Sequence, residues 1–114
     1  MNDQELAQHY VQQGFDWIKE HGATYDIQLS RVDPATLSIN SMDRCILAQA
    51  AAQPFEKILY FLYVDGVHEG NGRNTCDWIR RHGFVDFADE GITKQHWLHL
   101  IAQDAEGATH DPQP

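Results

Sequence analysis

The chain has 114 residues, 42% of them apolar, which is enough for one domain to fold around a single core without metals or disulfides. Its 17 Asp and Glu outnumber its 8 Lys and Arg, giving a formal net charge of −9. Because nucleic-acid backbones and anionic membranes are bound mainly through Lys and Arg, this balance argues against direct binding of either. It favours solubility and suits a partner protein with a basic surface.

A first helix is predicted from the capping residue Asn2, with Glu5 in the capping-box position, to His21-Gly22. Gly14 falls within the apolar stripe of this helix, where the missing side chain permits close approach of another helix. The stripe consists of Leu6, Tyr10, Val11, Gly14, Trp17 and Ile18.

Residues 23–40 carry a weaker pattern. Apolar and polar residues alternate over 25–29 and again over 37–39, as in half-buried strands, and Asp33-Pro34 is a turn signal between them. Two interpretations remain open, a small antiparallel pair or an extended segment laid over the helices.

The most apolar stretch is 44–64. Polar residues and Pro54 interrupt it, so it is not expected to cross a membrane. It is interpreted as one or two buried helices, with Pro54 either starting the second or kinking a continuous one. From Phe55 onward apolar residues cover nearly all sides, which predicts a helix buried in the core.

After Val64 the sequence predicts a glycine-rich loop and then a helix that Thr75 caps and His82-Gly83 ends. The last predicted helix is centred on Trp97. The segment 77–83 (DWIRRHG) echoes 16–22 (DWIKEHG), which is interpreted as convergence of two helix ends rather than duplication, because the flanks do not align.

These elements predict a mainly α fold, a compact bundle of four to five helices around a central apolar helix, with at most a small β element at 23–40. The predicted division is a single helical domain at 1–103 and a polar C-terminal tail at 104–114.

The two cysteines, Cys45 and Cys76, are interpreted as small buried side chains. Neither belongs to a CxxC pair, and a disulfide between them stays open. The first residues do not resemble a signal peptide, so a cytoplasmic location is expected.

The string Glu69-Gly70-Asn71-Gly72-Arg73 resembles the second half of the HPFx(D/E)GNGR signature of Fic-type adenylyltransferases. The resemblance implies a loop that binds an anion or nucleotide at a helix N-terminus, where free amides favour negative charge. However, Asp65 stands where that family has its catalytic histidine, and Gly66-Val67 replace its Pro-Phe. The alternative function is therefore a degenerate Fic-like or anion-binding module, with Gly70, Asn71, Gly72 and Arg73 as the binding residues.

His96 and His99 share a helix face at a spacing that can serve a metal, but no second pair of ligands has comparable spacing. No metal or other cofactor is predicted. The chain also has no nucleophile elbow, P-loop, HExxH or CxxC motif. The sequence thus predicts a protein that is not an enzyme.

Carboxylates gather in two connections and form the predicted partner-binding site. If they share one side of the fold, they make an acidic face able to occupy a groove built for phosphates. A solvated acidic surface without a function is the other interpretation. The predicted site residues are Asp65, Glu69, Asp86, Asp89 and Glu90.

From Met42 to Gln103 the order of features resembles small uncharacterised proteins of phages and actinobacteria that carry a C-V-L-G-Q helix, a helix ending in G-F and a last helix centred on Trp. The matching residues are Cys45-Ile46-Leu47-Ala48-Gln49, Gly83-Phe84 and Trp97.

That resemblance implies an origin in a phage or mobile element. In size and charge the chain is also similar to anti-CRISPR proteins. The expected function is an acidic inhibitor that mimics nucleic acid and binds a basic nucleic-acid-binding protein, such as a CRISPR effector subunit. The oligomeric state stays open.

Overall fold

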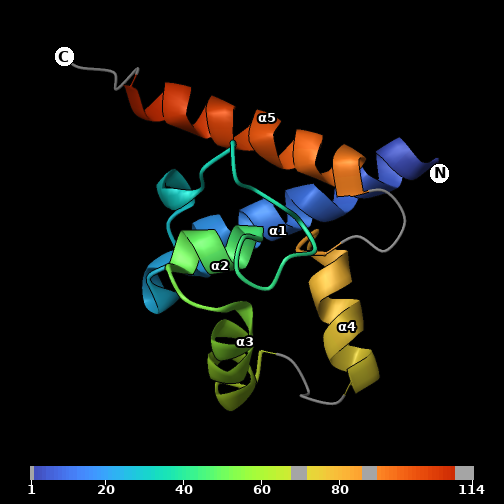
Figure 1. The fold of residues 1–114 in the computed structure, drawn as a ribbon, viewed down its shortest axis with the longest axis vertical. Helices are drawn as coiled ribbons and strands as arrows, with labels where there is room; N and C mark the ends of the chain where they lie inside the picture. The colour runs from blue at the N-terminus through green and yellow to red at the C-terminus, as the bar shows by residue number, and fades with distance from the viewer. Residues whose placement is uncertain (1, 68–71, 86–89, 110–114) are drawn as a thin grey trace.

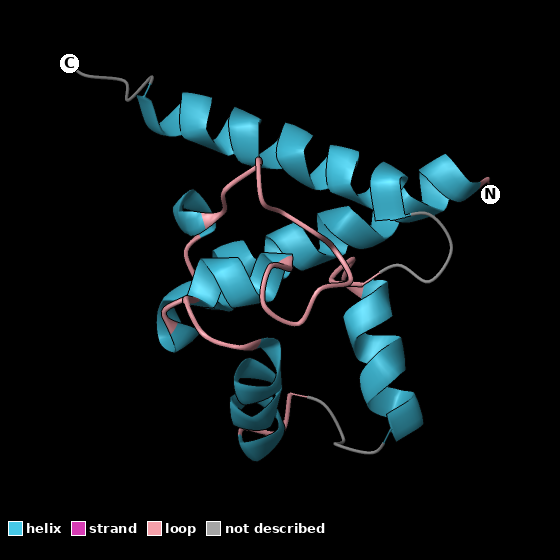
Figure 2. Ribbon diagram, in the orientation of Figure 1, coloured by secondary structure: helices cyan, strands magenta, loops and turns pink. Residues whose placement is uncertain are grey.

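The computed structural model describes residues 2–67, 72–85 and 90–109, and within these ranges the chain forms helices and loops but no strand (Figure 1, Figure 2). The elements are α1 (Asp3–Tyr25), the 3-10 turn η1 (Leu29–Arg31), α2 (Ile46–Ala51), α3 (Phe55–Val64), α4 (Gly72–Arg81) and α5 (Glu90–Thr109). The predicted mainly α bundle is confirmed.

The helices form two groups that share one hydrophobic core. In the first group, α5 lies alongside α1, and α1 also packs against α4 (Figure 1). In the second, α2 packs against η1 and α3. Figure 1 shows α3 and α4 extending away from the α1–α5 pair, on the side opposite α5.

The central apolar helix is α2, in which Ile46, Leu47 and Ala50 are completely buried. Its N-terminus is capped by Cys45, whose Sγ accepts a hydrogen bond from the amide of Ala48 over 3.4 Å. Burial raises the pKa of the Cys45 thiol above its ordinary value, which keeps this cysteine protonated and inert. The expectation that Cys76 is also buried is wrong, because its side chain is exposed on α4.

Pro54 separates α2 from α3 and caps α3, so the interpretation as two helices is correct. The expectation that α3 is buried on most sides is wrong. Phe55, Ile58 and Leu62 face the core, whereas Tyr60 and Val64 are 62% and 60% exposed. The main helix partner of α3 is the short α2, and Tyr60, Phe61, Tyr63 and Val64 are 42–62% exposed.

Backbone contacts replace side chains where α1 meets α4. Gly14 lies against the backbone carbonyl of His82, and Gly83 lies against the backbone of Val11. The buried Trp97 of α5 completes the junction, its indole Nε1 donating a hydrogen bond to the carbonyl oxygen of Gly83 over 2.6 Å. The close approach predicted at Gly14 is therefore confirmed, and α1, α4 and α5 are joined at this point.

The four helices α1 to α4 end in the same way, with one residue in the left-handed conformation and two amides that bond back to the last turn, as in the Schellman motif. The left-handed residues are Asp26, Ala52, Gly66 and Gly83. The predicted end of the first helix at His21-Gly22 is wrong, because α1 continues to Tyr25.

Gly22 is required for packing instead of for termination. A Cβ at Gly22 would lie 2.7 Å from the carbonyl oxygen of Ile27, where the chain turns back on the helix.

The segment 27–45 contains η1 and turns, and no strand pair forms. The alternation of apolar and polar residues in the sequence corresponds to alternating buried and more exposed side chains. Ile27, Leu29, Leu37 and Ile39 all lie in the core. The backbone bonds of this segment go to α1, α2 and α3 as well as to nearby turns; the amide of Gln28, for example, donates to the carbonyl oxygen of Ala50 over 2.9 Å. The segment lies over the helices as in the second interpretation, but it folds into η1 and turns instead of running extended.

Two further boundaries differ from the predictions. α4 begins at Gly72, before the expected cap Thr75, and α5 continues to Thr109, past the predicted domain boundary at residue 103. The start of the predicted polar tail is thus helical, and Asp104 forms an ion pair of 2.8 Å with Lys19 of α1. Residues 110–114 lie outside the described part.

Gly14→Ala is expected to destabilise the protein by about 2–3 kcal/mol, because the new methyl group would overlap the carbonyl oxygen of His82 and push α4 away from α1. The loss is measured by urea unfolding. Gln8→Ala, on the exposed side of the same helix, is the control. A neutral or stabilising Gly14→Ala, as intrinsic helix propensity alone would give, contradicts the close contact.

Ala52→Gly is expected to stabilise the protein by about 0.5–1 kcal/mol, because Ala52 is exposed and held at φ 54, where an L side chain is strained. Ala51→Gly is the matched control and should destabilise, since Ala51 lies inside α2. Thermal unfolding of both variants distinguishes these effects, and equal changes would mean that α2 does not end at Ala52.

Candidate protein-binding surface

Most of the predicted partner-binding and anion-binding residues lie outside the described part of the structure. Glu69, Gly70, Asn71, Asp86 and Asp89 belong to this group, as do the side chains of Arg73 and Glu90. Gly72 is the first residue of α4, so the glycine string does precede a helix N-terminus as the sequence suggested. Whether the predicted carboxylates share one face stays a prediction.

Asp65 is the predicted site residue whose surroundings are described. It follows the last residue of α3, and its amide donates to the carbonyl oxygen of Phe61 over 3.1 Å. Its side chain is exposed, and no Lys or Arg among the described residues forms an ion pair with it. Asp65 therefore contributes a negative charge at the end of α3 that no described Lys or Arg side chain pairs with.

Beside the Asp65 carboxylate, α3 exposes aromatic and aliphatic side chains. We call this surface, formed by Tyr60, Phe61, Tyr63 and Val64, the exposed α3 face. Their exposed fractions are large for residues of this type, because apolar side chains are usually buried within a domain. A contiguous apolar patch on a surface is typical of a site that contacts another molecule. The exposed α3 face comprises Tyr60 at 62%, Phe61 at 42%, Tyr63 at 50% and Val64 at 60%.

A pocket of about 370 Å³ lies between the exposed α3 face and the end of α1. We call it the end pocket, because the ends of helices line it. It combines aromatic, amide and carboxylate groups, a mixture that suits a polar or charged side chain better than a purely apolar one. The end pocket is lined by Thr24, Tyr25, Asp26, Gln53, Phe61, Val64 and Asp65.

Within the end pocket, Tyr25 and Asp65 interact directly. Burial raises the pKa of the Tyr25 phenol, and hydrogen bonding to the Asp65 carboxylate and its negative charge raise this pKa further. The phenol therefore stays neutral and keeps its proton as a donor. The Tyr25 ring also stacks on Trp17, with ring centroids 6.0 Å apart, which fixes its orientation.

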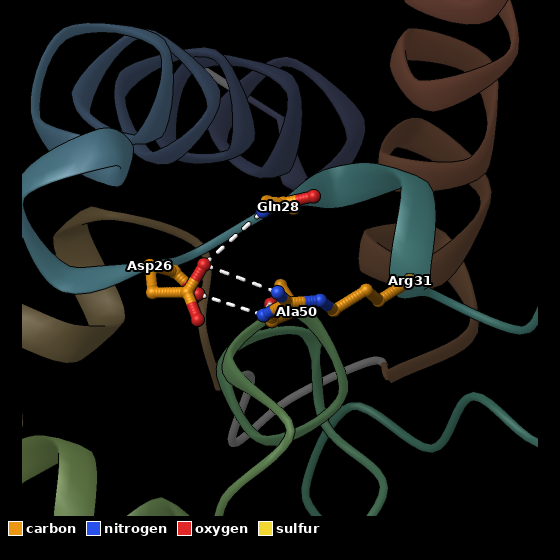
Figure 3. A network of polar contacts seen from close by, with 4 residues as sticks. All are labelled: Asp26, Gln28, Arg31 and Ala50. Atoms are coloured by element: carbon orange, nitrogen blue, oxygen red, sulfur yellow. Dashed lines mark hydrogen bonds and ion pairs between the residues drawn. The ribbon is translucent and has the colours of Figure 1, made fainter.

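Arg31 bonds to Asp26, one of the residues that line the end pocket (Figure 3). Its Nη2 contacts Oδ1 of Asp26 over 3.1 Å, and its Nη1 donates to the carbonyl oxygens of Asp26 and Ala50 over 2.8 and 3.1 Å. Gln28 donates a second hydrogen bond to Asp26 Oδ1, also over 3.1 Å. These bonds connect the end of α1 to the end of α2 and position the Asp26 side chain.

Aromatic rings connect the pocket to the core. Trp17 meets Trp78 edge to face with centroids 5.4 Å apart, and Trp78 stacks on His82 at 4.3 Å. These tryptophans are the anchors of the two DWI…HG segments. The repeated DWI…HG segment was thus a sequence signal that α1 and α4 contact each other, which the sequence analysis interprets only as convergence of two helix ends.

Sequence reasoning missed the pocket residues Tyr25, Gln53 and Phe61 as functional candidates. Tyr25 was assigned to a possible strand and Phe61 to the core. The pattern of apolar residues around α3 could not show that its partner helix, α2, is too short to cover it.

The described residues contain no group of three or more His, Cys, Asp or Glu side chains able to hold a metal ion. His96 and His99 lie on α5, half-buried and exposed respectively. In the same ranges, no helix combines the length and apolarity needed to cross a bilayer.

Comparison of the chain with models of known protein families, with curated proteins and with solved structures found no match.

Asp65→Asn is expected to lower the pKa of the Tyr25 phenol, because it removes the negative charge that opposes phenolate formation. NMR titration of the protein labelled at the tyrosine ring carbons resolves Tyr25 from the other tyrosines. Asp33→Asn, an exposed aspartate elsewhere, is the control. An unchanged Tyr25 pKa in Asp65→Asn would show that the two groups do not interact.

Proposed function

We propose that the protein is a non-enzymatic inhibitor that binds a protein with a basic, nucleic-acid-binding surface. The observation that carries this proposal is the exposed α3 face beside the carboxylate of Asp65, which forms no ion pair with a Lys or Arg of the described part of the chain. Aromatic side chains supply contact area at a protein interface, and carboxylates next to them select a partner of opposite charge.

The distribution of charge in the described residues supports a basic partner. Three cations are already engaged: Lys19 with Asp104 over 2.8 Å, Arg31 with Asp26 over 3.1 Å and Arg80 with Asp77 over 3.5 Å. These ion pairs leave the formal net charge of −9 unchanged, and a charge of this sign accelerates association with a positively charged protein.

Within this proposal, the protein has a phage or mobile-element origin and acts in the cytoplasm on a CRISPR effector subunit, whose channel for nucleic acid is basic. This finer assignment is supported by the size and charge of the chain and by its resemblance to small phage and actinobacterial proteins. Glu69, Asp86, Asp89 and Glu90 are proposed to extend the acidic surface that begins at Asp65.

The alternative is an anion-binding module that uses Gly70 to Arg73, and it is favoured by the start of α4 at Gly72. Calorimetry with ATP distinguishes the two: saturable binding that Arg73→Ala abolishes would support the alternative, and its absence at millimolar nucleotide would remove it.

The proposal is tested by competition between the protein and DNA for a purified CRISPR effector. The protein is expected to displace DNA and to bind more weakly as salt rises from about 0.05 M to about 0.3 M. Charge reversal at the proposed surface should weaken binding roughly tenfold. Two variants test this, the double Asp65→Lys, Glu69→Lys and the triple Asp86→Lys, Asp89→Lys, Glu90→Lys.

The matched control is the double Asp16→Lys, Glu20→Lys, which adds the same charge as the first variant on the outward side of α1. Binding that this control leaves nearly unchanged would support a localised acidic surface. Weakening by the control equal to that by Asp65→Lys, Glu69→Lys would mean that net charge alone determines the affinity, and no weakening at either salt concentration would contradict the proposal.

A further inference from the structure

Three helix C-termini meet at the end pocket. Tyr25 is the last residue of α1, Gln53 follows the left-handed residue that ends α2, and Val64 is the last residue of α3. Capping amides bond several of the last carbonyl groups of these helices, but the C-terminal end of a helix still carries partial negative charge, which favours a cation nearby. The backbone alone thus makes this end of the molecule electronegative.

The chain already binds a guanidinium at this end. Arg31 donates from Nη1 to the carbonyl oxygens of Asp26 and Ala50, which belong to the ends of α1 and α2 (Figure 3). This internal contact shows which cation the terminal carbonyls accept. It occupies Oδ1 of Asp26, whereas the carboxylate of Asp65 has no Lys or Arg partner among the described residues.

The side chains of the pocket add what a second guanidinium requires. Asp65 supplies a full negative charge, and Phe61 and Tyr25 supply rings over which a flat cation can stack. A compact ammonium group would use the charge but not the stacking. A phosphate or nucleotide would be repelled by both carboxylates and by the helix ends. The volume of about 370 Å³ is within the range of pockets that take a small ligand.

We propose that the end pocket receives an arginine side chain of the basic partner protein. This inference rests on the proposed function and names the group by which the partner is recognised. The guanidinium pairs with Asp65 and stacks against Phe61, and Arg31 is a positioning residue that holds Asp26 and the end of α2 in place.

The test uses the full chain and small probes, so that it does not depend on a partner. Uniformly 15N-labelled protein is titrated with N-acetyl-arginine N-methylamide, with the lysine analogue and with the citrulline analogue, which is uncharged but nearly the same shape. The arginine probe is expected to saturate with a dissociation constant of about 1–10 mM. The arginine probe should change the backbone amide chemical shifts of residues 24–26, 53 and 61–65. It should bind at least about threefold more tightly than the lysine probe, and also more tightly than the citrulline probe.

Two variants and a control define the site. Asp65→Asn is expected to weaken the arginine probe at least about fivefold, and Gln53→Glu, which adds a carboxylate to the same pocket, is expected to strengthen it. Asp16→Asn on the outward side of α1 should have no effect. Because one variant weakens and another strengthens, a general loss of folding cannot produce the expected pattern.

The inference is overturned if the shifts map to other residues, if citrulline binds as well as arginine, or if Asp65→Asn leaves the affinity unchanged. These outcomes are separate from failure of the proposed function. Arginine binding in the pocket supports the inference even where the effector assay shows no competition. Loss of effector binding on charge reversal, without arginine binding in the pocket, supports the proposed function and rejects the inference.

Discussion

The backbone contact between Gly14 of α1 and the His82–Gly83 turn after α4 is the constraint on which the arrangement of the first helix group depends. It brings two helices together without intervening side chains, and the indole of Trp97 ties α5 to the same turn. Since α1 is fixed on these two sides, its C-terminal end is held in a defined place. Because the packing of α1 against α4 and α5 is rigid, Tyr25 and Asp26 at the end of α1 can line a pocket instead of fraying.

The left-handed helix ends explain why the residues that line the end pocket lie at one end of the molecule. Asp26, Ala52 and Gly66 each turn the chain sharply after a helix, so the termini of α1, α2 and α3 can lie together. The strain at Ala52 and Asp26, which are not glycines, is offset by the hydrogen bonds that close each motif. The partial charges of these termini then act in the same direction as the carboxylate of Asp65.

The sequence was sufficient to predict the helices, the close approach at Gly14 and the break at Pro54, because local periodicity and the special geometry of Gly and Pro determine these features. The sequence was insufficient where contact with another part of the chain determines the end of a helix or the exposure of its side chains. α1 passes Gly22 because the turn at Ile27 packs on that glycine, and no local signal marks Asp26 as the end of the helix. The exposed α3 face depends on the length of α2, which apolar content does not reveal. Asp65 is the predicted partner-binding residue whose side chain lies within the described part of the chain, and its role stays a prediction. Its effect on Tyr25 is a tertiary interaction that the sequence does not indicate.

The structure combines a scaffold of α1, α4 and α5 with a pocket formed where α1, α2 and α3 terminate, which is the proposed binding site. The most direct test of this division is amide hydrogen exchange of the free protein and of its complex with the purified basic partner. Slower exchange in the complex is expected at residues 24–26, 53 and 61–65, with little change along the outward side of α1 and along α5. Slowing confined to α5 and the outward side of α1, with residues 61–65 unaffected, would contradict the account.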